Sequence, residues 1–480
     1  MYRISANIGK ARLATAGVCA ATLARMEARR RVYELTARRA RHFPDLSPMS
    51  VDTSGLDARD AGLARALDQE VVRRWLTLEA IASSRLTRPW EQLQPPLQAS
   101  VLVGTAELLF MHRRADHAAI NEAVEWAKST VRPKAGGLIN AVLRGVSRLR
   151  DEHIPAPAAH PGDPELARRW VPLSDGSAWQ LKEPVFSDDP GRRLAEQTSH
   201  HPALITHWSK RHGLAKASEL ARHSLVQPPL IVTGLPHTVD NPPSGCEPHD
   251  EPGFWVCTGG RETLDDLLAG HASVRVQDPT AAAAVRMTEG LSPRRIADVC
   301  AGKGTKTQQL ATLHPEATIL ATDRDDARRA VLAETFAGHD RVTVLEPDRV
   351  TDHLQTVDLL VFDMPCSNTG VLARRLEARH RFTGHHLSEL VQLQRQIIAD
   401  HLALLTDAGH VLYTTCSLED EENADQIAWL RRWHQMELLK EAAQMPTGRP
   451  GAPPQQYRDG GYAALLSRNA VDSFSGPSAL

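Results

Sequence analysis

The sequence predicts an α/β fold: a parallel sheet with helices on both faces, preceded by an all-helical domain. Between residues 277 and 470, short β-branched runs alternate with helical stretches, which is typical of a parallel sheet covered on both sides. Between Leu56 and Leu149, apolar residues recur instead at helical spacing. The 480 residues are enough for roughly three domains at about 150 residues each.

The composition shifts along the chain divide it into regions. The segment "HIPAPAAHPGDPE" is rich in Pro, Asp and Gly and predicts an irregular linker. After it, "HPALITHWSKRHGLAKASELARHSL" predicts two helices, and "PPLIVTGL" and "GFWVCTG" predict strands. The expected regions are a helical domain at 1–150, a linker at 151–195, a small α+β subdomain at 196–276 and the parallel-sheet domain at 277–470.

Charge and cysteine usage restrict the class of protein. The formal net charge is -2 at pH 7, so a nucleic-acid partner would need a local basic surface. The six cysteines never form C-x-x-C, which argues against a zinc knuckle or a disulfide scaffold and favours free thiols. The histidines show no metal-ligand spacing, so we expect no metal. No apolar run approaches the roughly 20 residues that span a bilayer, so we expect no membrane partner.

The N-terminal segment is strongly basic. Its composition resembles that of a transit peptide, which is rich in Arg and poor in acids. Apolar residues nevertheless recur at helical spacing through "VCAATLARMEARRRVYELTARRA", which favours a folded helix with a basic face. We therefore expect a cytoplasmic protein, acting as a monomer.

A Gly-x-Gly turn follows the first expected strand, in "DVCAGKGTKTQQLA". Gly302 and Gly304 allow the backbone to turn tightly and to approach a ligand. The stretch is neither a Walker A loop nor a full G-x-G-x-x-G, since position 307 is Thr. Asp323 ends the second strand, where a carboxylate can accept both hydroxyls of a ribose. A nucleoside-bearing cofactor is therefore expected, and nicotinamide cofactors and S-adenosylmethionine both fit these residues.

Two cysteines lie at the ends of expected strands. "VFDMPCSNTGVL" places Asp363 and Cys366 after one apolar run, and "VLYTTCSLEDEEN" places Cys416 after another. A lone cysteine at a strand end is more often a small core residue. Two of them with similar flanks favour a functional pair, because ligands of parallel sheets lie at the carboxyl ends of the strands.

These motifs resemble motifs I, IV and VI of the RNA cytosine-5 methyltransferases of the RsmB/Fmu/Sun type, in the NOL1/NOP2/Sun family. "DVCAGKGTKT", "FDMPCSNTGVL" and "YTTCSLEDEEN" occur in the family's order and spacing, after "VQDPTAAAAV", which resembles the segment that precedes the core. "AAINEAVEWAKSTVRPKAGGLINAVLRGV" is similar to the NusB-like RNA-binding domain of bacterial RsmB members. The resemblance implies a Rossmann-like S-adenosylmethionine methyltransferase core behind a NusB-like domain. The chain departs from the family pattern at Lys303, Thr305 and Asn368, and the family usually has Gly at the last of these positions.

The resemblance also implies an activity, the formation of 5-methylcytidine in RNA through a covalent adduct. By that resemblance Cys416 is the nucleophile that adds to carbon 6, and Cys366 assists release; in DNA enzymes the Pro-Cys cysteine is the nucleophile. Asp363 is expected near N3 of the ring and Lys306 near the base or its negative charge. The expected substrate is 16S ribosomal RNA; the alternatives are transfer RNA and a non-catalytic RNA-binding factor.

S-adenosylmethionine is expected to lie on the Gly-x-Gly loop and on carboxylates at the strand ends. The expected cofactor-binding residues are Cys300, Ala301, Gly302, Lys303, Gly304, Asp323, Asp348 and Asp363. The side chain of Cys300 is expected to pack, as are those of Cys19, Cys246 and Cys257. Asp348 is expected either to meet the adenine or to cap a loop.

Two further polar groups flank the cysteine motifs. Glu421, Glu422 and Asn423 are interpreted as a helix start with favourable N-terminal acids. An arginine cluster after Cys366 is interpreted either as a phosphate clamp or as an exposed charged face. Its members are Arg374, Arg375, Arg379 and Arg381.

Overall fold

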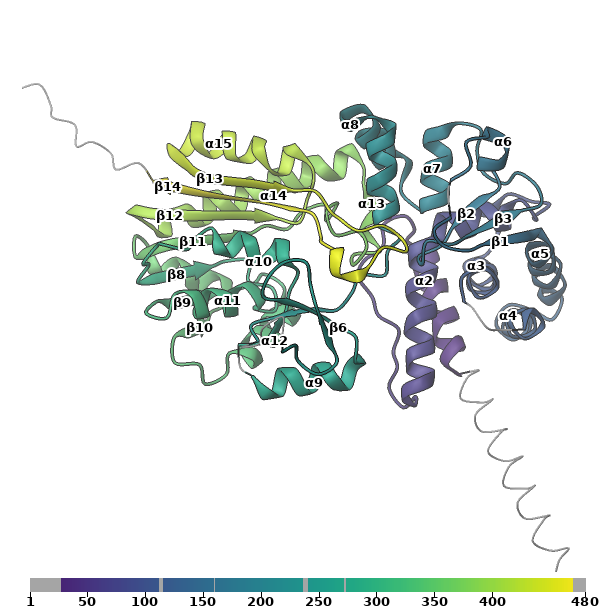
Figure 1. Cartoon of the computed structure of the whole chain (residues 1–480), viewed down its shortest axis with the longest axis horizontal. Coiled ribbons are helices and arrows are strands. Elements are labelled where there is room, and N and C mark those ends of the chain that lie inside the picture. The colour runs from purple at the N-terminus through teal and green to yellow at the C-terminus, as the bar shows by residue number, and fades with distance from the viewer. Residues whose placement is uncertain (1–26, 112–114, 159, 236–240, 272, 469–480) are drawn as a thin grey trace, which may run out of the picture. The chain divides into compact units, whose positions relative to one another are not determined.

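The computed structural model describes residues 27–111, 115–158, 160–235, 241–271 and 273–468 (Figure 1). The chain divides into two compact units. Unit 1 comprises Met1–Leu225 together with a short later segment, Arg375–Arg381. Unit 2 comprises Val226–Arg374 and Phe382–Leu480.

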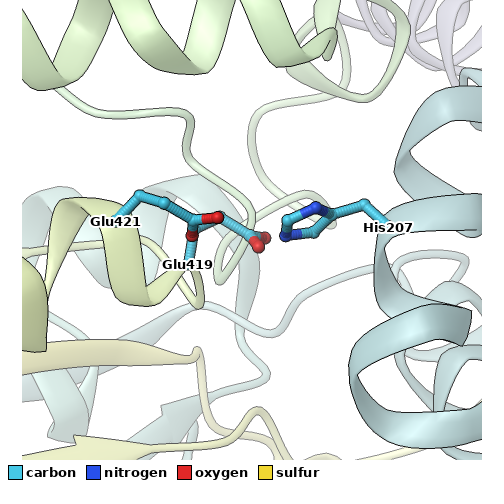
Figure 2. Close-up of side chains that lie close together, drawn as sticks. All are labelled: His207, Glu419 and Glu421. Atoms are coloured by element: carbon cyan, nitrogen blue, oxygen red, sulfur yellow. The ribbon is translucent and has the colours of Figure 1, made fainter.

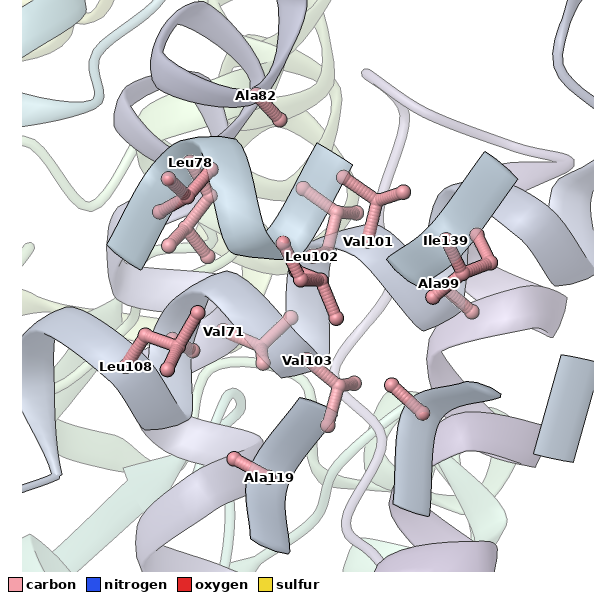
Figure 3. Close-up of a cluster of buried hydrophobic side chains, with 14 of the residues drawn as sticks. Val71, Leu78, Ala82, Ala99, Val101, Leu102, Val103, Leu108, Ala119 and Ile139 are labelled. Atoms are coloured by element: carbon pink, nitrogen blue, oxygen red, sulfur yellow. The ribbon is translucent and has the colours of Figure 1, made fainter. Parts of the chain in front are cut away.

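Unit 1 begins with helices, as the apolar periodicity predicts. Residues 27–40 are helical; the part of the expected basic helix before residue 27 lies outside the described residues. The helices that follow are α2 (Ala58–Ser83), α3 (Pro95–Phe110), α4 (Asp116–Thr130) and α5 (Ala135–Leu149). Their apolar faces form one core, in which Val71, Leu102 and Ile139 are fully buried (Figure 3). The prediction of a helical domain is confirmed over this stretch.

The segment expected as an irregular linker is folded. Its strands form a three-stranded antiparallel sheet in the order β1 (Arg150–Ile154), β3 (Ala178–Leu181), β2 (Trp170–Pro172), with α6 (Pro164–Ala167) between β1 and β2. Val171, Leu181 and Phe186 are buried in the same core as the helices of unit 1. The linker prediction was wrong because the Pro and Gly residues here mark turns between short strands.

Two further helices complete this part of unit 1. They are α7 (Pro190–Thr198) and α8 (Pro202–His223). Within α8, Gly213 has φ 81° and ψ 157°, which breaks the helix in two, as the sequence predicts. These helices pack with unit 1 and not with the strands that follow, so the boundary between the units falls after Leu225 and not near residue 195.

A short segment from the second half of the chain, which contains α13 (Ala378–Arg381), also belongs to unit 1. Arg379 is fully buried there. Its guanidinium donates hydrogen bonds to the carbonyl oxygens of Arg73 (3.1 Å), Thr198 (3.4 Å) and Ser224 (2.8 Å). Both interpretations of Arg379, phosphate clamp and exposed face, were therefore wrong, because its donors are used on backbone carbonyls of the protein.

Unit 2 contains the expected parallel sheet, with strand order β10-β9-β8-β11-β12-β14-β13. The predicted strands are all present and pair in parallel: β8 (Arg295–Asp298), β9 (Thr318–Ala321), β10 (Val342–Val344), β11 (Val357–Asp363) and β12 (Leu405–Thr415). Sequence analysis missed β13 (Met436–Gln444) and β14 (Gly461–Arg468), which add an antiparallel pair beside β12.

Helices cover both faces of this sheet (Figure 1). On one face lie α14 (Gly384–His401) and α15 (Ala424–His434), and on the other α10 (Pro279–Arg286), α11 (Thr305–Leu313) and α12 (Asp326–Thr335). The neighbours Val361 and Phe362 of β11 enter different cores: Val361 packs with Leu310 of α11, and Phe362 with Ile398 of α14. This is the alternation that a strand buried on both faces requires.

A second, four-stranded sheet precedes the parallel one in unit 2. Its order is β5 (Cys246–Pro248), β6 (Phe254–Cys257), β4 (Ile231–Thr233), β7 (Arg275–Val276), and α9 (Gly260–Gly270) follows β6. Cys246 and Cys257 face each other across β5 and β6 and are buried in an apolar cluster, as expected for packing residues. None of the helices in the described residues combines the length and apolarity needed to cross a membrane.

Candidate active site

The carboxyl ends of β11 and β12 carry two cysteines. The strands pair in parallel, with Asp363 opposite Thr414. Cys366 follows β11 after a short turn, and Cys416 directly follows β12. The two sulfur atoms lie 3.1 Å apart. The ends of these neighbouring strands therefore bring the two thiols together.

Asn368 shapes the turn after Cys366. Its φ of 62° lies in the left-handed region, which glycine and asparagine adopt more readily than other residues. The side-chain Nδ2 of Asn368 donates to the carbonyl of Cys366 at 2.7 Å, and its Oδ1 accepts from the Cys416 Sγ at 3.3 Å. Asparagine can therefore replace the family's usual glycine here, and it adds a direct contact to the Cys416 thiol.

A lysine and a carboxylate lie at the same edge of the sheet. Lys306 Nζ lies 2.8 Å from Asp363 Oδ2, and Thr414 Oγ1 donates to Asp363 Oδ1 at 3.1 Å. Burial acts to lower the pKa of Lys306, but Asp363 and Cys416 act to raise it, and the net direction is upward. Lys306 is therefore positively charged, next to both Asp363 and Cys416.

A cavity of about 140 Å³ lies beside Lys306 and Cys416, with Thr280 and Gly460 among its lining residues. Asp459, another lining residue, accepts a hydrogen bond from Arg374 Nε at 2.7 Å. The interpretation of Arg374 as a phosphate clamp was therefore wrong, because this carboxylate already occupies its guanidinium. Lys306 and Cys416 both line this cavity.

The Gly-x-Gly turn lies between β8 and α11, with φ 59° at Gly302 and 93° at Gly304. The backbone N–H of Gly302 donates to Asp323 Oδ2 at 2.8 Å, and that of Asp325 donates to Asp323 Oδ1 at 2.9 Å. Asp323 is thus held against the turn, at the end of β9. An open glycine backbone beside a fixed carboxylate fits the ribose of a nucleoside cofactor.

Asp298 lies beneath this turn, at the end of β8. It is fully buried, and Thr307 Oγ1 donates to its Oδ2 at 2.7 Å. Its Oδ1 is buried without a hydrogen-bond partner. Burial raises the pKa of Asp298 to about 7, so near neutral pH this carboxyl takes up or releases a proton easily.

The other predicted cofactor residues lie at the same edge of the sheet. Ala301 is buried and its N–H donates to the carbonyl of Thr322 at 2.9 Å, while Lys303 is exposed. Cys300 packs against the core, and burial raises the pKa of its thiol well above the usual value. Asp348 is exposed in the 3-10 helix Pro347–His353, beyond β10. A contact of these side chains with the cofactor stays a prediction.

The interpretation of Glu421, Glu422 and Asn423 as a helix start is confirmed, because α15 begins at Ala424 with Asn423 at its N-cap. The carboxylates of Glu419 and Glu421 lie within 4.8 Å of each other (Figure 2). Glu422, in contrast, is fully buried and accepts a hydrogen bond from the N–H of Ser367. Sequence analysis missed this role because a run of acids before a helix is normally solvated; the available signal was its nearness to Cys416.

The glycine at position 304 gives a first prediction. A Cβ there would lie 2.6 Å from Phe336 Cε2 and 2.8 Å from Leu332 Cδ1, in addition to the positive φ. Gly338 has a similar φ of 77° but open space around it. We expect Gly338→Ala to cost about 1–2 kcal/mol in unfolding free energy, and Gly304→Ala roughly 1–3 kcal/mol more, from overpacking. Calorimetric unfolding of both variants tests this; equal losses would contradict it.

Comparison with known proteins gives a family match for each of two parts of the chain. Residues 289–467 match the family described as "16S rRNA methyltransferase RsmB/F". Residues 16–148 match the NusB family. The chain joins an RsmB/F-type methyltransferase domain to a NusB-family domain. The RsmB/F-type domain contains the glycine turn and both cysteines, and S-adenosylmethionine, the cofactor expected from the sequence, is the cofactor of such a domain.

Curated relatives match over most of the length of the chain. The Ribosomal RNA small subunit methyltransferase B of Klebsiella pneumoniae subsp. pneumoniae is 29% identical over 429 residues, which cover 85% of this chain and 91% of that protein. The protein of the same name from Yersinia enterocolitica is 28% identical over 440 residues, covering 87% and 94%. The crystal structure of PH0851 has the same fold, with a TM-score of 0.63 at 19% identity over 86% of this chain and 91% of that one.

Proposed function

We propose that the protein methylates carbon 5 of a cytosine in 16S ribosomal RNA through a covalent adduct with Cys416. The observation that carries this proposal is the pair of thiols, with 3.1 Å between their sulfur atoms, at the ends of neighbouring parallel strands. Transfer of a methyl group to an amine or hydroxyl needs no thiol. Carbon 5 of cytosine does, because it becomes nucleophilic only after a group has added to carbon 6.

The chemistry divides between the side chains already described. The Cys416 thiolate adds to carbon 6, which makes carbon 5 enamine-like, and S-adenosylmethionine, when bound, supplies the methyl group. Lys306 stabilises the negative charge that develops on the ring, and Asp363, 2.8 Å from Lys306, is the expected hydrogen-bond partner at N3. Water then accepts the hydrogen on carbon 5 as a proton, and the electron pair of that C–H bond re-forms the double bond between carbons 5 and 6. The Cys416 thiolate leaves carbon 6 with the electron pair of the broken bond, and Cys366 assists this release. The thiolate is the nucleophilic form of a cysteine, and the positive charge of Lys306 beside Cys416 would stabilise that anion.

The test is methyl transfer to isolated ribosomal RNA. With labelled S-adenosylmethionine, we expect label in 16S ribosomal RNA, and bisulfite sequencing of total RNA with and without the gene should show one cytosine that is protected only when the gene is present. Label found only in transfer RNA would show that transfer RNA, and not 16S ribosomal RNA, is the substrate. RNA binding without any label would favour the non-catalytic factor.

The NusB-family domain is proposed to add RNA affinity rather than chemistry. The basic residues of this stretch are Lys128, Arg132, Lys134, Arg144, Arg148 and Arg150. Lys128 Nζ already lies 2.7 Å from Glu125, and Arg150 pairs with Asp116. The other four are exposed, so they are the residues most accessible to the phosphates of RNA.

We expect a fourfold variant, in which these exposed residues are each replaced by Gln, to bind RNA more weakly than the wild type. Its RNA affinity should also change less with salt concentration. The replaced residues are Arg132, Lys134, Arg144 and Arg148. Each lost phosphate contact should lower the slope of log affinity against log salt by about 0.7–0.9. Lys128→Gln is the control, because Glu125 already neutralises that charge. Titrations at several salt concentrations give both slopes; an unchanged slope in the fourfold variant would contradict the proposal.

A further inference from the structure

Glu422 connects the two turns that carry the cysteines. Its carboxylate accepts hydrogen bonds from the turn after β11: the N–H of Ser367 donates at 2.9 Å to Oε1, and Ser367 Oγ donates at 2.5 Å to Oε2. Ser367 directly follows Cys366. The carboxylate thus holds the backbone next to one thiol.

The turn after β12 is connected to the same carboxylate through Ser367. Ser417, the residue after Cys416, places its Oγ 3.1 Å from Ser367 Oγ, and Ser417 acts to lower the pKa of Glu422. Tyr413 of β12 donates from its hydroxyl to the Glu422 carbonyl at 2.6 Å. The residue after Cys366 therefore donates directly to Glu422, and the residue after Cys416 is linked to Glu422 through the hydroxyl of Ser367.

Gln394 of α14 completes the connection. Its Nε2 donates to Glu422 Oε1 at 3.1 Å and to the carbonyl of Pro365, the residue before Cys366, at 2.9 Å. Gln394 and Glu422 are both fully buried. A buried carboxylate is costly unless its oxygens are satisfied, and the donors of Ser367 and Gln394 satisfy the oxygens of Glu422.

We propose that Glu422 is a positioning residue that ties the Cys366 turn to the Cys416 turn and so holds the Cys366 thiol where it can act on the covalent intermediate. This proposal rests on the proposed function. Electrostatics point the same way: the hydrogen bond with Cys416, burial and the charge of Glu422 together raise the pKa of Cys366 well above its usual value. Cys366 therefore keeps its proton in the resting pair.

The test is Glu422→Gln, which keeps the shape but turns an amide NH₂ toward donors that need an acceptor. Displacement of Cys366 by about 1 Å should slow turnover on the order of 100-fold. Because Cys416 still adds to the base, a protein–RNA adduct should accumulate although Cys366 is present. The readouts are methyl transfer and an RNase-sensitive, slow-migrating band on a denaturing gel.

Asp425→Asn is the matched control, since it removes the same charge at an exposed position on the next helix. This variant should turn over like the wild type and should not form the band.

Because Glu422→Gln can destabilise the fold, its S-adenosylmethionine affinity is measured as well. A second variant, Ser367→Ala, removes one hydroxyl donor and keeps Glu422, and it should show the band more weakly. Loss of turnover in Glu422→Gln with unchanged cofactor affinity and no band would overturn the positioning role, as would wild-type turnover.

The two proposals fail in different ways. If the wild type transfers no methyl group to cytosine, the proposed function is wrong whatever Glu422 does. If the wild type is active and Cys366→Ala accumulates the adduct but Glu422→Gln does not, the proposed function stands and the role of Glu422 is wrong.

Discussion

Replacing Cys416 by alanine is expected to end both methyl transfer and covalent capture of RNA. The Sγ of Cys416 is the atom that would bond to carbon 6, and no other described thiol lies beside Lys306 in the cavity. Loss of a covalent nucleophile should reduce turnover by a factor on the order of 10⁴ or more. The measurement is methyl transfer to 16S ribosomal RNA, together with a denaturing gel of the protein mixed with RNA and cofactor.

Replacing Cys366 by alanine is the paired experiment. It should also end turnover, but a slow-migrating, RNase-sensitive band should appear, because addition at Cys416 still occurs while release stalls. Cys246→Ala is a suitable control, since that thiol is buried in the second sheet. If Cys416→Ala formed the band and Cys366→Ala did not, the roles would be reversed and the arrangement of the DNA enzymes would hold.

Replacing Asp323 by alanine is expected to abolish S-adenosylmethionine binding at ordinary cofactor concentrations. A carboxylate that accepts both ribose hydroxyls supplies charge-assisted hydrogen bonds worth about 1.5–3 kcal/mol each, so affinity should fall at least about 100-fold. Asp323 also holds the N–H of Gly302, so the variant loosens the cofactor turn as well.

Isothermal calorimetry measures this loss directly. Asp340→Ala removes the same charge from an exposed position between β9 and β10 and should bind the cofactor normally. Far-ultraviolet circular dichroism should show that the Asp323 variant remains folded. Unchanged affinity in Asp323→Ala would remove this carboxylate from the site.

The parallel sheet was predictable because its strands are short apolar runs, each followed by a helical stretch. The antiparallel pair β13 and β14 was not, because β13 reads "MELLKEAAQ", a sequence of helix-forming residues with mostly exposed side chains. Pairing with β14 on its one side overrides that propensity. Likewise, the Pro and Gly residues of the supposed linker gave no sign that Val171 and Leu181 are buried in the helical core.

The candidate active site likewise contains residues that could be predicted from the sequence and residues that could not. Cys366, Cys416 and Asp363 were predictable, because residues that follow parallel strands meet at one edge of the sheet. The positions of Glu422 and Arg379 were not, because burial of a charged side chain depends on donors or carbonyls contributed by distant segments. No local pattern reports that Arg379 meets backbone carbonyls of three separate helical segments.

The placement of Arg375–Arg381 in unit 1 has a consequence for biosynthesis. A nascent chain that has emerged only as far as Leu225 lacks the arginine that satisfies the carbonyls of Arg73, Thr198 and Ser224. The helical half can reach its final state only after most of the sheet strands have been translated. A gene fragment that ends at Leu225 would therefore yield a unit in which these carbonyls lack the donors of Arg379.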